Sequence, residues 1–199
     1  MADHYYTAEP ASESRPVRIE QQMFGQKFVF TTDHGVFSRD GVDPGTALLA
    51  KSVPPLSGRV LDLGCGWGAL GIPLAKINPG AHFVLSDVNR RAAQLARDNA
   101  RANGLSNLEV VESDGFGQIE GSFDAILSNP PIRAGKQVLL SLFAEAYARL
   151  SAGGSLYLVI RTQQGAASYL RFLQALSPAA SVIARGGGYR ILHLRKEER

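Results

Sequence analysis

The stretch Val60-Leu61-Asp62-Leu63-Gly64-Cys65-Gly66-Trp67-Gly68-Ala69 decides the fold class. An apolar run leads into a glycine cluster and then into a helix-forming sequence, which is typical of a parallel strand, a tight loop and a helix. Glycines without a Cβ let the backbone approach a nucleotide-like ligand closely. The spacing Gly64-x-Gly66-x-x-Ala69 also satisfies the loose dinucleotide-binding form, so the loop alone does not separate a nicotinamide cofactor from another adenosine-bearing one.

Outward from this stretch, strand-like apolar runs alternate with helix-like segments. We expect two closing strands to flank Gly186-Gly187-Gly188 as an antiparallel pair. The rhythm predicts an α/β fold: a doubly wound, mostly parallel seven-stranded sheet of Rossmann-like type with an antiparallel C-terminal edge. The expected strands are 59–63, 81–86, 108–111, 123–127, 156–161, 182–184 and 189–194, and the expected helices are 69–77, 89–103, 136–150 and 165–176.

The composition changes once, near the proline-containing segment 52–58. Before it, residues 17–23 and 27–31 are β-prone runs that predict a small hairpin, and Asp43-Pro44 is a cap and first-turn proline that opens a short helix to Ala50. We therefore expect residues 1–52 to form an N-terminal extension packed on the core, and residues 53–199 to form the catalytic domain.

The chain has 199 residues, a net charge of +3 and a single cysteine, Cys65. These values are typical of a globular domain that needs no disulfide, and the lone cysteine fits a reducing compartment. Residues 1–6 lack the basic and apolar regions of a secretory signal, and no apolar run reaches the roughly 18 residues that span a bilayer. We expect a cytoplasmic protein with no membrane partner.

Three aspartates follow the expected strands and narrow the choice of cofactor. Asp87 lies about 20 residues after the glycine loop, where a carboxylate accepts hydrogen bonds from ribose hydroxyls in either cofactor class. Asp62 and Asp114 would form an acidic lip, which repels a pyrophosphate and attracts an ammonium and a sulfonium. This favours S-adenosylmethionine. Asp114 would accept from the adenine amino group with Phe116 or Leu63 over the ring, although a loop aspartate is otherwise a common turn former.

The segment Phe123-Asp124-Ala125-Ile126-Leu127-Ser128-Asn129-Pro130-Pro131 carries the catalytic prediction. A buried strand ends in Asn-Pro-Pro at the carboxyl edge, where ligands of open α/β sheets bind. The prolines remove two amide donors, so carbonyl acceptors remain on the Asn129 side chain and the Pro130 backbone. Two such acceptors can hold the hydrogens of an amino group and aim its lone pair at an electrophile.

On these motifs, together with residues 35–43 before the core, the chain resembles class I S-adenosylmethionine-dependent methyltransferases. The resemblance is to the "small" methyltransferase family that includes small-subunit rRNA guanine-N2 methyltransferases. It implies that the cofactor is bound by Asp62, Gly64, Gly66, Gly68, Asp87, Asp114 and Asn129, and that Asn129, Pro130 and Pro131 are the catalytic residues.

Two departures from the family bear on the substrate. Ile132 stands where many relatives have an aromatic residue that stacks on the target base, so either another residue, with Phe37 as the candidate, provides the stacking or the substrate differs. The chain also lacks the second, degenerate domain of the larger rRNA enzymes. Arg133 and Lys136 follow the prolines, and we expect them to contact RNA phosphates. The alternative is that they are ordinary charged residues that solvate a loop and cap the start of a helix.

No metal site is predicted, because none of the four histidines has a partner at metal-ligand spacing and Cys65 stands alone in the glycine loop. The sequence therefore predicts an S-adenosylmethionine-dependent N-methyltransferase of RNA, with ribosomal guanine N2 as the target. A protein glutamine N-methyltransferase, a nicotinamide oxidoreductase and a non-catalytic cofactor-binding or RNA-binding module remain as alternatives. The residues leave open which nucleotide is modified, whether the RNA is naked or assembled, the oligomeric state and the need for a partner.

Overall fold

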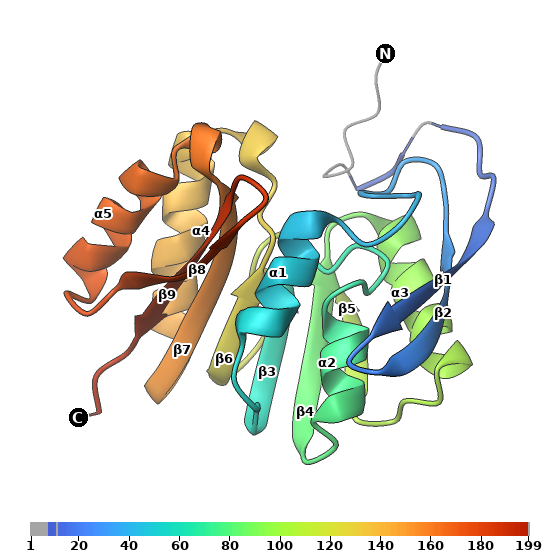
Figure 1. Cartoon of the computed structure of the whole chain (residues 1–199), viewed down its shortest axis with the longest axis horizontal. Helices are drawn as coiled ribbons and strands as arrows, with labels where there is room; N and C mark the ends of the chain where they lie inside the picture. Colours follow the sequence, from blue (N-terminus) through green and yellow to red (C-terminus); the bar gives the residue numbers. More distant parts are fainter. Residues whose placement is uncertain (1–7, 11, 199) are drawn as a thin grey trace.

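A computed structural model describes residues 8–10 and 12–198 and shows a seven-stranded sheet of order β5-β4-β3-β6-β7-β9-β8 (Figure 1). Five strands run parallel: β3 (Gly58–Leu63), β4 (Ala81–Asp87), β5 (Leu108–Glu112), β6 (Phe123–Ser128) and β7 (Leu150–Arg161). At the other end, β9 (Tyr189–Arg195) pairs antiparallel with both β7 and β8 (Ser181–Gly186). The predicted fold class is confirmed, including its antiparallel C-terminal edge.

Helices cover both faces of this sheet. On one face lie α1 (Pro44–Ser52), α2 (Gly71–Ile77) and α3 (Arg90–Ala102), which share a core with Trp67 and Phe83. On the other lie α4 (Lys136–Arg149) and α5 (Ala166–Leu176), around Phe123 and Phe143 (Figure 1). Burial on both faces explains why the central strands read as apolar runs rather than as alternating patterns.

The hairpin of β1 (Val17–Met23) and β2 (Gln26–Thr32) forms a separate two-stranded sheet. Asn99 of α3 and Asn103, the residue after α3, hold it in place by reciprocal hydrogen bonds to its backbone. The Thr31 amide donates to Asn99 Oδ1 at 2.7 Å, and Asn99 Nδ2 donates to the Thr31 carbonyl at 2.9 Å; Asn103 makes the same pair of bonds with Val29. The hairpin thus packs on α3, whereas α1 packs on the main sheet. The division at residue 52 stays a prediction.

Element boundaries follow local chemistry closely. Asp43 caps α1 by accepting from the Thr46 amide, and Asn89 caps α3 by accepting from the Ala92 amide. The strand expected over 156–161 is longer, because β7 begins at Leu150 and passes a register shift opposite β6. Two short 3-10 helices, η1 (Ile132–Ala134) and η2 (Thr162–Gln164), were not expected from the sequence.

The topology opens a crevice at one place on the carboxyl edge. From β3 the chain continues outward through β4 to β5, and then returns to β6 on the other side of β3 and continues to β7. Loops after β3 and β6 therefore diverge to opposite sides, which leaves a ligand-sized opening at the switch point. Among the residues that the structure describes, no helix is both long and apolar enough to cross a membrane.

Candidate active site at the carboxyl edge of the sheet

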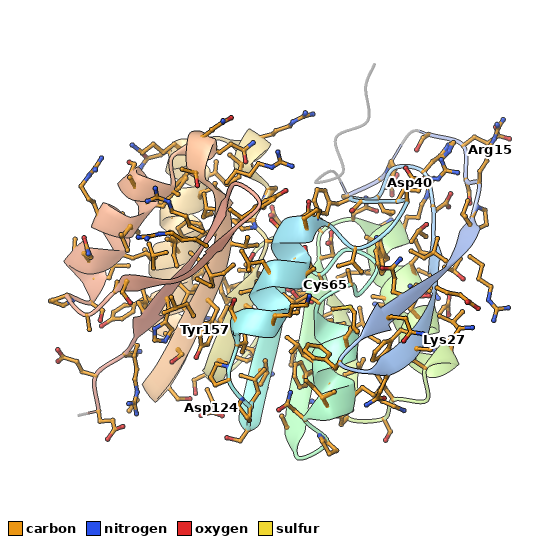
Figure 2. The ribbon with its side chains drawn as sticks, in the orientation of Figure 1. Arg15, Lys27, Asp40, Cys65, Asp124 and Tyr157 are labelled. Atoms are coloured by element: carbon orange, nitrogen blue, oxygen red, sulfur yellow. The ribbon has the colours of Figure 1, made fainter. Side chains whose placement is uncertain are left out.

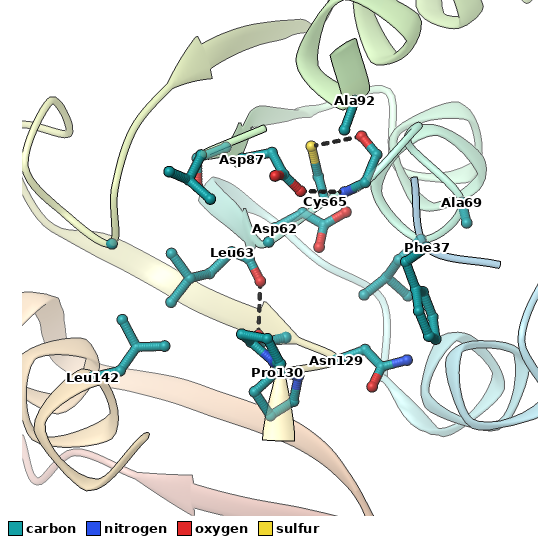
Figure 3. Close-up of a pocket in the computed structure, with 18 of the residues that line it drawn as sticks. Phe37, Asp62, Leu63, Cys65, Ala69, Asp87, Ala92, Asn129, Pro130 and Leu142 are labelled. Atoms are coloured by element: carbon teal, nitrogen blue, oxygen red, sulfur yellow. Dashed lines mark hydrogen bonds between the residues drawn. The ribbon is translucent and has the colours of Figure 1, made fainter. Parts of the chain in front are cut away.

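A cavity of about 310 Å³ lies at this switch point (Figure 3). Its walls come from the loop after β3, the ends of β4 and β6, the loop after β5 and the first turns of α4. The predicted cofactor residues Asp62, Gly64, Gly66, Asp87 and Asp114 all line it. Residues far apart in the sequence thus meet in one concave site, as ligand binding requires.

The glycine loop needs its glycines for two different reasons. Gly64 and Gly66 have φ of +75° and +56°, and a Cβ on either would meet nothing within 4 Å, so their backbone faces open space in the cavity. Gly68 has φ of +94°, does not line the cavity, and would collide with Ile72 if it carried a Cβ. Gly68 therefore shapes the turn into α2 and does not itself contact the cavity.

Asp87 ties the glycine loop to the start of α3. Its Oδ2 accepts from the Gly66 amide at 2.8 Å and its Oδ1 accepts from the Asn89 amide at 2.9 Å. Burial raises the pKa of Asp87 to about 6, against the effect of these backbone hydrogen bonds. Beside it, Ser86 Oγ is buried, and no hydrogen-bond partner is found for it among the described residues. This wall therefore presents polar oxygens to the cavity, which fits a ligand rich in hydroxyl groups.

Asp62 does not lie at the lip, where the sequence placed it. Its side chain is 1% exposed, and its Oδ2 accepts from the Gly71 amide at 2.9 Å at the start of α2. Burial, and secondarily the charge of Asp87, raises the pKa of Asp62 to about 7, although the Gly71 hydrogen bond opposes the shift. Asp62 thus forms the inner wall of the cavity, whereas the exposed Asp114 lies at its rim.

Asn129 is held in one orientation by α1. Its Nδ2 donates to Thr46 Oγ1 at 2.9 Å and to Asp43 Oδ2 at 3.3 Å, and Tyr189 donates its hydroxyl hydrogen to Asp43 Oδ1 at 3.0 Å. Because the amide nitrogen is committed to α1, the Oδ1 atom remains as the acceptor. Figure 3 shows this amide between Pro130 and Phe37.

A second cavity, of about 390 Å³, adjoins the first. The two share Phe37, Asp43, Asn129 and Pro130, so Asn129 stands where they meet. The second cavity is lined further by Arg133 and by Arg161, whose guanidinium lies 4.8 Å from the centre of the Tyr189 ring. Phe37 is 36% exposed and presents its ring to both cavities, as the stacking assignment requires.

Some sequence predictions fall outside these cavities. Phe116 is buried in the core beneath α4 rather than over the cavity, and Lys136 lines neither cavity. The apolar wall is formed instead by Leu63, which was one of the two expected residues, together with Val138 and Leu142 of α4. Val138 and Leu142 were not expected, because their spacing in the sequence is that of an ordinary core face. Leu139 and Ala134 complete that wall.

Neither a metal nor a thiol nucleophile is indicated at the site. No group of three His, Cys, Asp or Glu able to hold a metal occurs among residues 8–10 and 12–198. His4, and residues 1–6 on which the prediction about a secretory signal rests, lie outside the described residues. Cys65 is buried, and burial together with Asp87 and Asp62 raises the pKa of its thiol well above the usual value. A thiol held in the neutral form is a weak nucleophile, so Cys65 serves as a small packing residue.

Comparison with known proteins identifies the family. The family model described as "Methyltransferase small domain" matches residues 27–193. The chain belongs to this methyltransferase small domain family. The match confirms the predicted enzyme class, and the predicted cofactor is that of the family.

Individual proteins are similar to this methyltransferase over most of its length. It is 38% identical to the Bacillus subtilis protein named YbxB, over 98% of this chain and all of that one. It is 38% identical to the Escherichia coli ribosomal RNA small subunit methyltransferase C, over 74% of this chain and 45% of the relative. A solved structure of the T. thermophilus 16S rRNA N2 G1207 methyltransferase, in complex with AdoMet and guanosine, matches with a TM-score of 0.83 and 27% identity. That match covers 94% of this chain and 52% of the solved one, so the chain spans about half the length of these rRNA methyltransferases.

The two aspartates of this methyltransferase predict a pH dependence of cofactor binding. S-adenosylmethionine carries an ammonium and a sulfonium, so the predicted contacts of Asp62 and Asp87 with it are strongest when both carboxyls are ionised. With pKa values of about 7 and about 6, each carboxyl must release a proton on binding once the pH falls below its pKa. Calorimetric titration should show an affinity that levels off above about pH 8, falls as the pH drops through 7, and falls more steeply below pH 6. Asp62→Asn should remove the upper part of this dependence; an affinity independent of pH from 5 to 8 would contradict the assignment.

Proposed function

We propose that this methyltransferase transfers a methyl group from S-adenosylmethionine to an exocyclic amine of RNA, with N2 of a guanine as the target. The observation that carries the proposal is the position of Asn129 at the junction of two cavities, one lined by the predicted cofactor residues and one lined by Arg133 and Arg161. An amide fixed at such a junction can hold an amine between a methyl donor and the rest of its nucleotide.

The first cavity fits S-adenosylmethionine by the chemistry of its walls. Asp87 accepts hydrogen bonds from the ribose hydroxyls, Asp114 at the rim accepts from the adenine amino group, and the open backbone at Gly64 and Gly66 accommodates the methionine part. Leu63, with the aliphatic side chains of α4, covers the adenine ring. When bound, S-adenosylmethionine supplies an electrophilic methyl group on a sulfonium.

Asn129 and Pro130 act on the target amine. Asn129 Oδ1 and the Pro130 carbonyl accept its two hydrogens, which keeps the nitrogen lone pair free and directed toward the first cavity. The lone pair of an exocyclic amine is delocalised into its ring, so fixing the geometry of that nitrogen provides most of the catalysis. An amide takes up no proton, and the contribution of Asn129 is therefore orientation rather than general base catalysis.

Asp43, Thr46 and Tyr189 are positioning residues, since they act through Asn129. Pro130 and Pro131 contribute rigidity, because their fixed φ angles limit the conformations of the loop that presents Asn129. On the substrate side, Phe37 stacks on the target base, because Ile132 occupies the position where many relatives have the stacking aromatic residue. An enzyme that acts on a base edge must meet the base outside its stack, which favours an unpaired nucleotide.

Similarity to known proteins supports RNA as the substrate. The E. coli relative is named a ribosomal RNA methyltransferase, and the T. thermophilus structure is described with guanosine. Neither fixes the nucleotide for this chain, which spans about half of each protein. A protein glutamine carboxamide presents the same NH₂ group to Asn129 and is the competing substrate.

The test is transfer of a labelled methyl group from S-adenosylmethionine into separated RNA and protein fractions. The substrates are naked small-subunit rRNA, assembled small subunits and the total protein of the same cells. We expect label in RNA. Label confined to protein would assign glutamine methylation instead, and label in neither fraction would overturn the proposal.

A further inference from the structure

Positive charge is strongly segregated along the chain. Residues 130–196 contain nine lysines and arginines and one carboxylate, Glu145, whereas residues 1–129 contain eleven and fifteen. The modest net charge of the whole chain therefore conceals a basic C-terminal part. In the fold, residues 130–196 form β7, β8 and β9 with α4 and α5, which is the left half of the molecule in Figure 1.

Three of the nine cations are used within the fold, at the amino edge of the sheet. Arg149 donates to the Ile119 carbonyl at 2.8 Å and lies 3.7 Å from Glu145. Arg195 donates to the Gly153 carbonyl at 3.0 Å, and Lys196 donates to the Leu150 carbonyl at 2.7 Å. Their structural roles account for these charges without any ligand.

Five of the other six lie at the carboxyl edge of the sheet: Arg133, Lys136, Arg161, Arg185 and Arg190, which we call the basic edge. Of these, Arg133 and Arg161 line the second cavity. Within the part of the chain that the structure describes, no ion pair is found for any of the five; Arg161 stacks on Tyr189. On the opposite side of the molecule, two exposed cations at the β1-β2 hairpin are paired, Arg15 with Glu13 and Lys27 with Glu20.

The tip of the β8-β9 hairpin places two of these arginines side by side. Arg185 and Arg190 are direct partners across the two antiparallel strands, so their side chains lie on the same face. Like charges directly opposite each other destabilise a sheet. The Thr162 amide donates to the Gly188 carbonyl at 2.8 Å and fixes the hairpin turn to the end of β7. The pair is thus held at the carboxyl edge, on the face of the sheet that α4 and α5 cover, at a cost in stability that no carboxylate offsets.

We propose that the basic edge binds the phosphates of single-stranded RNA next to the target nucleotide. This inference rests on the proposed function, because it takes the target base to enter the second cavity. Arg133 and Arg161 line that cavity and would contact the phosphates nearest the target, while Arg185 and Arg190 on the hairpin would contact those farther along the strand. Guanidinium forks match phosphate oxygens, and several such contacts provide affinity without reading sequence.

The experiment measures binding of a fluorescein-labelled single-stranded RNA of about 20 nucleotides by anisotropy at several salt concentrations. It compares wild type with the double variant Arg185→Ala/Arg190→Ala. The control double variant Arg15→Ala/Lys27→Ala removes the same charge from exposed side chains at the hairpin of β1 and β2, labelled in Figure 2. A melting temperature no lower than that of wild type, with unchanged S-adenosylhomocysteine affinity, establishes that each variant is folded.

We expect Arg185→Ala/Arg190→Ala to bind the RNA at least about fivefold more weakly than wild type near physiological salt. The slope of log affinity against log salt should fall in magnitude by about 1.4, because two single-strand phosphate contacts are lost. The control should match wild type. Equal affinity of the two double variants, or no RNA binding by wild type, would overturn the inference. Methyl transfer into RNA is measured separately. If wild type methylates RNA while both double variants bind RNA equally, this inference is wrong and the proposed function stands.

Discussion

Replacing Asn129 by alanine is expected to lower kcat for methyl transfer by about 100- to 1,000-fold, the usual effect of removing one fixed polar group that acts on the reacting atoms. The target amine would lose the Asn129 Oδ1 acceptor, which the hydrogen bonds from Asn129 Nδ2 to Thr46 and Asp43 hold in place. Affinity for S-adenosylmethionine should change far less, because the cofactor contacts of Asp87 and the glycine loop remain. Initial rates at saturating RNA and calorimetric titration of the cofactor measure the two effects separately.

Gln163→Ala is the matched control for this variant. Gln163 is an exposed carboxamide at the same edge of the sheet and lines neither cavity, so its loss should leave kcat within about twofold of wild type, as expected for a surface position. If Asn129→Ala retained wild-type kcat, the amine-orienting role would be wrong. If it lost cofactor affinity and kcat together, Asn129 would act mainly on the cofactor.

Replacing Asp87 by alanine is expected to weaken S-adenosylmethionine binding by at least about 100-fold, since each hydrogen bond to a charged group contributes about 1.5–3 kcal/mol. Two effects combine. The ribose loses its acceptors, and the Gly66 amide loses the carboxylate that orders the glycine loop. Calorimetric titration of S-adenosylmethionine measures the loss directly.

Two further variants separate these effects. Asp87→Asn keeps one acceptor oxygen for the Gly66 amide and should lose less affinity than Asp87→Ala. Asp98→Ala removes an exposed carboxylate of α3, bonded to Arg101, and should leave cofactor affinity unchanged. Wild-type affinity of Asp87→Ala would place the ribose elsewhere in the cavity.

The fold could be predicted because its signals are local and mutually consistent. Apolar runs, capping residues such as Asn89 and the alternation of strands and helices agree along the whole sheet. The early part of β7 could not be predicted, because Ser151-Ala152-Gly153-Gly154 has the composition of a turn. Pairing of Leu150 with Phe123 of β6, and the hydrogen bond from the Lys196 amide to the Gly154 carbonyl at 2.8 Å, hold this segment in the strand against its local preference.

The candidate site was predictable where function depends on a motif and less so where it depends on tertiary packing. Gly64, Gly66, Asp87 and Asn129 line the cavity at the carboxyl edge where the sequence placed them, whereas Gly68 does not. The burial of Asp62 was missed, since its depth depends on α2 packing over the end of β3. The network that links Tyr189 and Asp43 to Asn129 was also missed, because residues that far apart in the sequence meet only through the order of the strands.

Nucleoside analysis by mass spectrometry of small-subunit rRNA, treated with the enzyme and S-adenosylmethionine, tests directly whether an exocyclic amine of RNA is methylated. We expect N2-methylguanosine, formed by wild type and by Gln163→Ala but not above background by Asn129→Ala. Methylation on a ring nitrogen, a carbon or a ribose oxygen, or methylated glutamine in the protein fraction with unmodified RNA, would contradict the proposed function.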